Sequence, residues 1–163
     1  MGAPTRIAVL TISDAGARGE REDRSGHAIV DWIAEQHHEL TARALVPDES
    51  LEISNHLMQW ADSDIADLII TTGGTGLAPR DHTPEATRAV IDREAPGIAE
   101  AIRATGLRET PRAALSRGIA GIRGRTLIVN LPGSTSAVRD GLTTLAPLVD
   151  HLAAILHGDT AHQ

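Results

Sequence analysis

Four short apolar segments along the chain have the pattern of buried β-strands. Each is six or seven residues long, includes β-branched residues, and ends at a turn signal made of Gly, Pro, Ser or Asp. The third segment is apolar without interruption at its centre, which is typical of a strand buried on both faces of a sheet. The predicted strands are Ile7–Ile12, Leu40–Val46, Asp67–Thr72 and Thr126–Leu131.

Apolar residues recur at helical spacing between the first strands. Ile29, Trp32 and Ile33 fall on one face of a helix that we expect Ser25 to cap. The segment 48–50 (Asp-Glu-Ser) supplies caps for a second helix. The apolar residues of that second helix are Leu51, Leu57, Met58 and Trp60.

The second half of the chain carries further helix signals. Thr83 is the expected N-cap of a helix with Pro84 at its first position, and Pro96 with Gly97 should end that helix. The remaining expected elements are a helix beginning in Ile98–Ala104, an irregular strand pair in Leu115–Gly124, and a last helical region that is capped by Ser134 and divided by Pro147.

The alternation of strands and helices predicts an α/β fold, with helices on both faces of the sheet and right-handed crossovers. In such sheets, ligands bind outside the carboxyl ends of the strands. The loops richest in Gly and hydroxyl side chains follow Ile12, Thr72 and Leu131, each at the carboxyl end of a predicted strand. We therefore expect these three loops to line one crevice.

Composition narrows the chemistry that this site can perform. A length of 163 residues predicts a single domain, residues 1–163. Cys, Phe and Tyr are absent, and all 15 residues of the Lys+Arg count are Arg. These absences exclude a thiol nucleophile, a Cys-bound metal, a Walker A lysine and a lysine Schiff base.

Charge and hydropathy limit the classes of partner that the protein can bind. The net charge of −7 disfavours binding to a nucleic-acid backbone, and the lack of Phe and Tyr removes most stacking platforms for single strands. No segment reaches the roughly 18 apolar residues of a membrane span, and the first residues lack a signal-peptide layout. We expect a soluble, cytoplasmic protein without a nucleic-acid or membrane partner.

The glycine-rich segment Gly73-Gly74-Thr75-Gly76 follows the most apolar strand. Successive glycines can turn backbone N–H groups toward an anion, and no Cβ blocks its approach. The loop is therefore interpreted either as a phosphate cradle or as a flexible turn.

Two acidic residues near this loop also have two interpretations. Asp81 lies between the glycine loop and a helix start, and Asp48 lies at the end of a strand. Two carboxylates in one phosphate-lined crevice are typical of a divalent-metal site. Asp48 can instead be a helix cap, and Asp81 a cap or the partner of Arg80.

Several hydroxyl residues are equally ambiguous on local pattern alone. Ser25 and Ser134 can present N–H and hydroxyl groups to a phosphate at a helix start, or can serve as ordinary caps. Ser116 has no local pattern that distinguishes it, and the eight His residues show no metal-binding spacing.

Taken together, the motifs of this chain resemble a known family. They are Glu-Asp-Arg-Ser-Gly (22–26), Val-Pro-Asp-Glu (46–49), Thr-Thr-Gly-Gly-Thr-Gly-Leu-Ala-Pro-Arg-Asp (71–81), Thr-Pro-Glu-Ala-Thr (83–87), Arg-Glu-Ala-Pro-Gly (93–97), Leu-Ser-Arg (115–117), Gly-Ile-Arg-Gly (121–124) and Asn-Leu-Pro-Gly-Ser (130–134). Their order and spacing are similar to those of the molybdopterin adenylyltransferase family, Mog and MoaB, and of the G domain of gephyrin. The resemblance extends from Arg6 to about Leu156.

This resemblance implies a fold and a reaction. The fold is a three-layer αβα sandwich with a mostly parallel sheet, commonly assembled as a homotrimer. The reaction joins the phosphate of molybdopterin to AMP from ATP with Mg²⁺, and it releases pyrophosphate. The adenylylated product then goes to a molybdate-inserting enzyme. The alternative function is a molybdopterin carrier or scaffold of the MoaB type that does not turn over ATP.

The resemblance also assigns roles to residues. Asp48 and Asp81 match the two essential acids and are expected to hold Mg²⁺ and position ATP, and Ser116 matches a serine near the reacting phosphate. The residues expected to contact substrate are Ser13, Asp14, Ser25, Gly73, Gly74, Thr75, Gly76, Glu85, Pro132, Gly133 and Ser134. Two positions depart from the family pattern. His82 replaces a small apolar residue, and Thr135-Ser136 replace a common Pro-Lys, whose phosphate contact Arg139 could supply.

Overall fold

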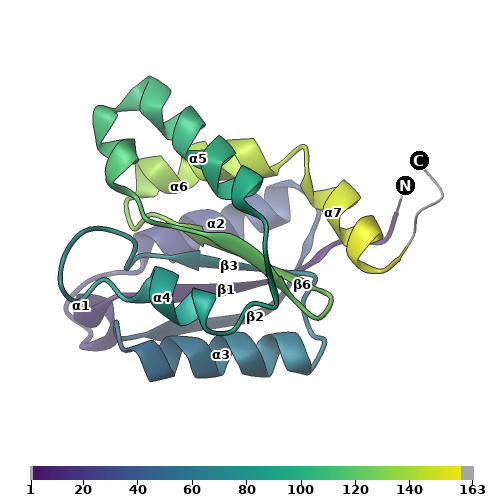
Figure 1. Cartoon of the computed structure of the whole chain (residues 1–163), viewed down its shortest axis with the longest axis horizontal. Helices are drawn as coiled ribbons and strands as arrows, with labels where there is room; N and C mark the ends of the chain where they lie inside the picture. Colours follow the sequence, from purple (N-terminus) through teal and green to yellow (C-terminus); the bar gives the residue numbers. More distant parts are fainter. Residues whose placement is uncertain (1, 159–163) are drawn as a thin grey trace.

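The protein is built on a six-stranded, mostly parallel sheet (Figure 1). The structure is a computed structural model that describes residues 2–158. The strand order is β2-β1-β3-β6-β5-β4, and the first four strands in this order run parallel to one another. These four strands are β1 (Arg6–Ile12), β2 (Glu39–Val46), β3 (Leu68–Thr72) and β6 (Thr126–Leu131). They match the four predicted strands to within a residue or two.

Two short antiparallel strands complete one edge of the sheet. Strand β5 (Ala120–Arg123) pairs with β6, and β4 (Arg93–Glu94) pairs with β5. The strand pair expected within Leu115–Gly124 was therefore partly wrong, because only β5 lies there and its start is preceded by the 3-10 helix η1 (Pro111–Leu115). A two-residue edge strand is too short to leave a periodic signal in the sequence.

Helices cover both faces of the sheet (Figure 1), which confirms the predicted α/β fold. One face packs against α2 (Arg24–Glu35), α5 (Pro96–Glu109), α6 (Thr135–Leu145) and α7 (Val149–Leu156). The other face packs against α3 (Ser50–Asp62) and α4 (Thr83–Arg88). A single turn of helix, α1 (Asp14–Ala17), follows β1. No helix within residues 2–158 is long and apolar enough to cross a membrane.

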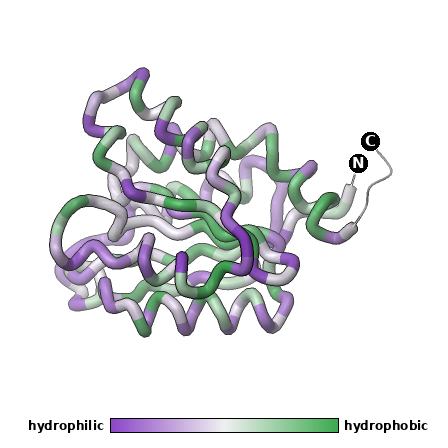
Figure 2. Tube along the Cα trace, viewed as in Figure 1, coloured by the Kyte–Doolittle hydropathy of each residue, from purple (hydrophilic) through white to green (hydrophobic). Residues whose placement is uncertain are grey.

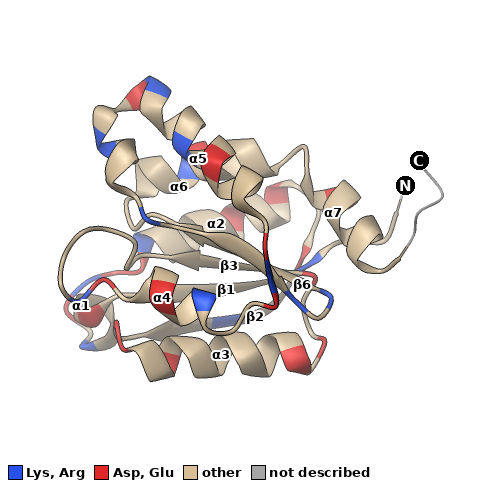
Figure 3. Ribbon diagram, in the orientation of Figure 1, with Lys and Arg blue, Asp and Glu red and all other residues tan. Residues whose placement is uncertain are grey.

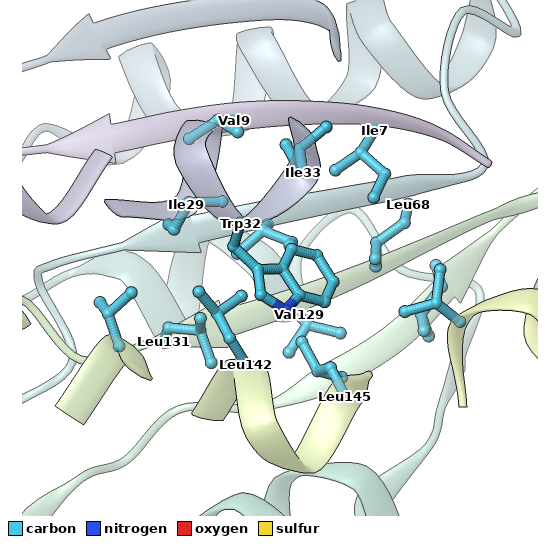
Figure 4. Close-up of a cluster of buried hydrophobic side chains, with 14 of the residues drawn as sticks. Ile7, Val9, Ile29, Trp32, Ile33, Leu68, Val129, Leu131, Leu142 and Leu145 are labelled. Atoms are coloured by element: carbon cyan, nitrogen blue, oxygen red, sulfur yellow. The ribbon is translucent and has the colours of Figure 1, made fainter. Parts of the chain in front are cut away.

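The strands divide the core into two layers because their side chains alternate between faces. In β1, Ile7 and Val9 belong to the layer under α2 and α6, whereas Ala8 and Leu10 belong to the layer over α3. Trp32 of α2 belongs to the first layer together with Val129 and Leu142, and Figure 4 shows its ring among these side chains. The most apolar segments of the trace in Figure 2 follow the central strands. Because the chain has no Phe or Tyr, the two core layers are filled mainly by branched aliphatic side chains.

Two expected helix caps differ in the structure. Asp23, not Ser25, caps α2, and its Oδ1 accepts a hydrogen bond from the N–H of Gly26 at 3.0 Å. Asp23 is also held in place by Thr11, whose hydroxyl donates to its other oxygen at 2.9 Å, so it is fixed where the cap is needed. His82, not Thr83, is the N-cap residue of α4, and the Thr83 hydroxyl donates instead to the carbonyl of Gly73.

Three further local expectations were wrong. Helix α4 ends at Arg88, and Pro96 begins α5 instead of ending α4, as proline can at a first helical position. The N-cap of α3, Glu49, lies within the expected segment 48–50, but it makes no side-chain capping bond, so that part of the expectation was wrong. Leu51 lies on the outer face of α3 with 75% of its surface exposed, whereas Ile53 is buried in the core.

At the end of the sheet opposite the predicted crevice, Asp67 joins the start of β1 to the helix α7 region. Its side chain accepts hydrogen bonds from the backbone N–H of Arg6 at 2.9 Å and from the Arg6 guanidinium at 2.8 Å. The His157 ring lies 2.6 Å from the same carboxylate. Burial alone would raise the pKa of Asp67, but the bonds from Arg6 and His157 outweigh it and lower the pKa.

We predict that Asp67→Asn lowers the free energy of unfolding by about 1–3 kcal/mol, because a buried charge-assisted network loses its negative charge and one of its two acceptor oxygens. Urea denaturation measures this effect. The native pKa lies below the ordinary value of 3.8. The part of the advantage that comes from the lowered pKa of Asp67 should therefore be fully present above pH 3.8 and be lost as the pH falls below 3.8 through the lower native pKa. Asp62→Asn is the matched control, because Asp62 also pairs with an arginine but is 60% exposed. Its effect should stay below about 1 kcal/mol. An equal loss in both variants would contradict the prediction.

Candidate functional site

The three loops that follow β1, β3 and β6 meet at the carboxyl end of the parallel strands, as expected. They line a first cavity of about 800 Å³, to which they contribute Ser13, Gly73, Gly74, Gly133 and Ser134. The segment 20–25 closes another side of this cavity. The site therefore lies where the topology of an α/β sheet places a ligand.

A second cavity of about 790 Å³ adjoins the first. Its walls come from the loop after β3, from α5 and η1, and from the start of α6. Gly74, Gly133 and Ser134 line both cavities, so they form the boundary between the two. Two cavities that meet at these three residues can hold two ligands that approach each other at this boundary.

The turn that leads from β3 into this boundary requires glycine at two consecutive positions, 73 and 74. Gly73 and Gly74 have φ angles of +96° and +68°, which side chains rarely adopt. A Cβ on Gly73 would lie 2.2 Å from the carbonyl oxygen of Ile12, and one on Gly74 would lie 2.6 Å from Asp48 Oδ2. The loop is therefore a built turn with close backbone approaches, which supports the cradle over the flexible-turn interpretation.

The N–H groups of the loop differ in what they bind. Gly73 donates to the carbonyl of Leu131 and so extends the sheet. The N–H groups of Gly74, Thr75 and Gly76 donate to no acceptor within residues 2–158. The first turn of α6 starts beside them, capped by Ser134. Free N–H groups and a helix N-terminus on one wall are suited to bind a phosphate.

Asp48 lies behind the glycine loop and not on a cavity wall. It is 5% exposed, and its Oδ1 accepts a hydrogen bond from the N–H of His82 at 3.0 Å. Its Oδ2 accepts none from residues 2–158, yet it is not sealed from solvent, because no buried side-chain oxygen of those residues lacks a partner. Burial raises the pKa of Asp48, and the nearby charges of Asp81 and Asp14 add to this effect.

Asp81 lines the second cavity. Its Oδ2 accepts a hydrogen bond from the N–H of Ala78 at 3.0 Å, which closes the turn at the end of the glycine loop. Arg80 does not pair with Asp81. It binds Asp14 through two bonds of 2.8 and 3.1 Å and Glu49 through one of 2.9 Å. The hydrogen bond from Arg80 lowers the pKa of Asp14 to about 2.

The two acids fit Mg²⁺ only together with ligands from a substrate. No group of three His, Asp or Glu side chains among the described residues could hold a metal ion. Mg²⁺, however, is commonly bound by one or two carboxylates, with water and substrate phosphates as its other ligands. Asp81 lies on the cavity wall, and Asp48 lies near enough for the charge of Asp81 to act on it. Asp48 Oδ2 accepts no hydrogen bond from residues 2–158, so the two acids provide such a partial set.

The structure brings most of the predicted site residues together. Those that line one cavity or both are Ser13, Ser25, Gly73, Gly74, Thr75, Gly76, Asp81, Ser116, Pro132, Gly133 and Ser134. Asp14, Asp48 and Glu85 line neither cavity. The carboxylate of Asp14 accepts hydrogen bonds from Arg80 and from the N–H of Asp48, and that of Glu85 accepts one from Arg117. Asp14 belongs to α1 and Glu85 to α4, and Figure 3 shows acidic positions on both of these helices.

Sequence reasoning missed residues that the fold brings to the site. Asp23 and Arg24 line the first cavity, and Arg103 and Arg112 line the second. Arg139 lines neither, because it faces a neighbouring groove between α2 and α6. Asp23 and Arg24 stand within a motif already singled out. Arg103 and Arg112 give no local signal, because they reach the site only through the packing of α5 and η1.

Comparison with known proteins agrees with this geometry. Residues 8–151 match the family model described as "probable molybdopterin binding domain". The chain is 39% identical over 160 residues to a protein from Helicobacter pylori strain J99 named molybdopterin adenylyltransferase, covering 94% of this chain and 88% of that protein. Among longer relatives, it spans only 26% of cinnamon from Drosophila melanogaster and 22% of gephyrin from Dictyostelium discoideum.

Solved structures show the same fold. The structure of the molybdopterin biosynthesis enzyme MoaB from Thermus thermophilus is 53% identical, with a TM-score of 0.89 over 94% of this chain and 97% of the other. A tungsten cofactor synthesizing MoaB from Pyrococcus furiosus is 35% identical, with a TM-score of 0.85 over 98% and 99%. By its sequence and by its fold, the chain belongs to the molybdopterin-binding domain family of molybdenum cofactor biosynthesis.

Proposed function

We propose that this protein is a molybdopterin adenylyltransferase, which transfers AMP from ATP to the phosphate of molybdopterin and releases pyrophosphate. The observation that carries the proposal is the shared wall of the two cavities. Each substrate brings a reacting phosphate, which is the phosphate of molybdopterin in one and the α-phosphate of ATP in the other. The free N–H groups of Gly74, Thr75 and Gly76 line the second cavity, starting at Gly74, where it meets the first. The name of the Helicobacter pylori relative supports this reaction over other phosphate chemistry.

The chain's residues act by positioning and by charge. The N–H groups of the glycine loop and of the start of α6 bind phosphate oxygens, and the hydroxyls of Thr75, Ser116 and Ser134 add donors. In-line transfer between phosphates depends mainly on holding the reacting groups and on stabilising their charge. The chain therefore needs no covalent nucleophile, which is consistent with its lack of Cys and Lys.

Mg²⁺, held by Asp48 and Asp81 together with substrate oxygens, would neutralise phosphate charge when bound. The arginines that line the cavities supply the fixed positive charge that lysine supplies in many nucleotide sites. Arg24 lies at the first cavity, and Arg103 and Arg112 lie at the second.

The remaining proposals rest on the family resemblance. The chain forms one domain, assembles as a homotrimer and works in the cytoplasm. Its product passes to a molybdate-inserting enzyme of the same pathway. Ser13, Ser25, Pro132 and Gly133 contribute to the substrate pocket, and all four line the cavities.

We expect the protein to release pyrophosphate when molybdopterin, ATP and Mg²⁺ are mixed, with no release when molybdopterin is omitted. Asp81→Asn should lower kcat by at least about 10²-fold, because a carboxylate at the metal and phosphate position is lost. The readout is a coupled pyrophosphate assay. Asp92→Asn is the matched control, since Asp92 also accepts one backbone N–H in a turn but lies outside both cavities.

Two other results would each reject the proposal. Binding of molybdopterin without any pyrophosphate release would identify a carrier. Hydrolysis of ATP in the absence of pterin would identify an unrelated nucleotide hydrolase.

We predict that Gly74→Ala lowers both activity and stability. The added Cβ would meet Thr83 Oγ1 at 2.3 Å and Asp48 Oδ2 at 2.6 Å, so the loop must move away from both. Gly19→Ala is the matched control, because Gly19 has a similar φ of +73° with no atom within 4 Å of the new Cβ. Backbone strain should cost both variants about 1 kcal/mol. Only Gly74→Ala should also lose most of its kcat, and equal activity of the two variants would refute a role for the close approach.

A further inference from the structure

We propose that Arg117 is a positioning residue that holds the segment 75–81, the wall of the second cavity next to its boundary with the first, in its working geometry, and that Glu85 acts by orienting Arg117. This inference rests on the proposed function for its kinetic consequence. Arg117 lines neither cavity, so it has no direct contact with a ligand bound in either one. Its contacts are with the loop that carries Thr75, Gly76 and Asp81.

Arg117 binds the glycine loop along most of its length. Its backbone N–H donates to the carbonyl of Thr75 at 2.8 Å, and its Nε donates to the carbonyl of Gly76 at 2.8 Å. Its Nη2 donates to the carbonyl of Asp81 at 2.7 Å. One residue therefore holds both ends of the segment 75–81. With these carbonyls bound, the free N–H groups and the Asp81 side chain remain available to the cavity.

The remaining nitrogen of the guanidinium, Nη1, is paired with Glu85 in the first turn of α4. The Arg117 hydrogen bond lowers the pKa of Glu85, so the carboxylate stays charged and keeps the guanidinium turned toward the loop. This contact explains why Glu85 stands close to the site without lining it. The pair supports the wall, whereas Glu85 itself is not a substrate contact.

The chemistry of this contact requires arginine. The guanidinium presents N–H groups in a rigid planar fork, so it can reach two carbonyls and a carboxylate in fixed directions. A lysine ammonium is a single charged centre on a flexible stem and cannot reproduce this arrangement.

A second arginine fixes the segment 116–118, to which Arg117 itself belongs. Arg103 of α5 donates from Nη1 to the carbonyls of Gly118 at 2.7 Å and Ser116 at 3.3 Å. The segment 116–118 is thus fixed to α5, and through Arg117 it is fixed to the glycine loop. Ser116 and Asp81 both line the second cavity, and this connection holds them at a set separation.

The kinetic consequence follows from the sensitivity of transfer reactions to geometry. A displacement of about 1 Å in a positioning group can cost about 10²-fold in rate. Arg117→Met removes the fork and keeps an unbranched apolar stem. We expect kcat to fall by about 10²-fold while the KM values for ATP and molybdopterin change little. Arg117→Lys should recover part of the lost kcat, because it restores the charge facing Glu85 without the fork.

Arg123→Met is the matched control. Arg123 also forms a two-bond pair with an acid, Asp62, and donates to a backbone carbonyl, that of Val90, but it lies outside both cavities. It should keep the wild-type kcat. Glu85→Gln should lower kcat less than Arg117→Met does, and it should have no further effect in the Arg117→Met background, since both changes act through one contact.

A readout independent of activity separates this inference from the proposed function. Amide hydrogen exchange followed by mass spectrometry should show faster exchange in the segment 78–83 of Arg117→Met, where the N–H groups of Ala78, Asp81 and Thr83 are hydrogen-bonded, and no change there in Arg123→Met. If the wild type releases no pyrophosphate, the proposed function fails, and the exchange result alone decides whether Arg117 holds the wall.

Three results would overturn the inference. The first is an unchanged exchange rate in the segment 78–83 of Arg117→Met. The second is a rise in KM with kcat preserved, which would place Arg117 in direct contact with substrate. The third is an additive effect of Glu85→Gln in the Arg117→Met background, which would give Glu85 a role of its own.

Discussion

A close approach of backbone to backbone determines where everything else in the site can lie. At the carboxyl end of β3, the chain turns against the carbonyl of Ile12 with no room for a Cβ at Gly73. Gly133 approaches the Cα of Gly73 at a similar point, where a Cβ would lie 3.3 Å away. Three strand ends therefore meet through close main-chain contacts, and the N–H groups of the glycine loop are left exposed beside the boundary between the cavities.

The periodic parts of the fold were predictable because their signal is local. The strand predicted over 67–72 forms over 68–72 and is buried on both faces of the sheet, as its apolar centre indicates, and the loops expected to converge do converge. Choices between equivalent residues were less predictable. Asp23 and Ser25 are equally good caps, and only the bonds to Asp23 from Thr11 and Arg43, which come from two strands, select between them.

The site was predictable as a set of loops but not as a set of contacts. Asp48 was placed correctly at a strand end, yet nothing in the sequence indicates that the glycine loop lies between it and the cavities. The partners of Arg80 and Arg117 are likewise set by chain segments about 30 to 70 residues away. The lack of lysine pointed to arginine as the source of positive charge. It did not indicate that Arg80 and Arg117 bind the loops of the site and not the ligands.

The shared wall also limits how the protein can change. Gly74, Gly133 and Ser134 belong to both cavities, so a substitution at any of them alters the recognition of two ligands at once. Variation that retunes one specificity and spares the other must come from the outer walls, which are segment 20–25 on one side and α5 with η1 on the other. To change the specificity for the nucleotide or for the pterin, these outer segments should therefore be varied, and Gly74, Gly133 and Ser134 should be kept.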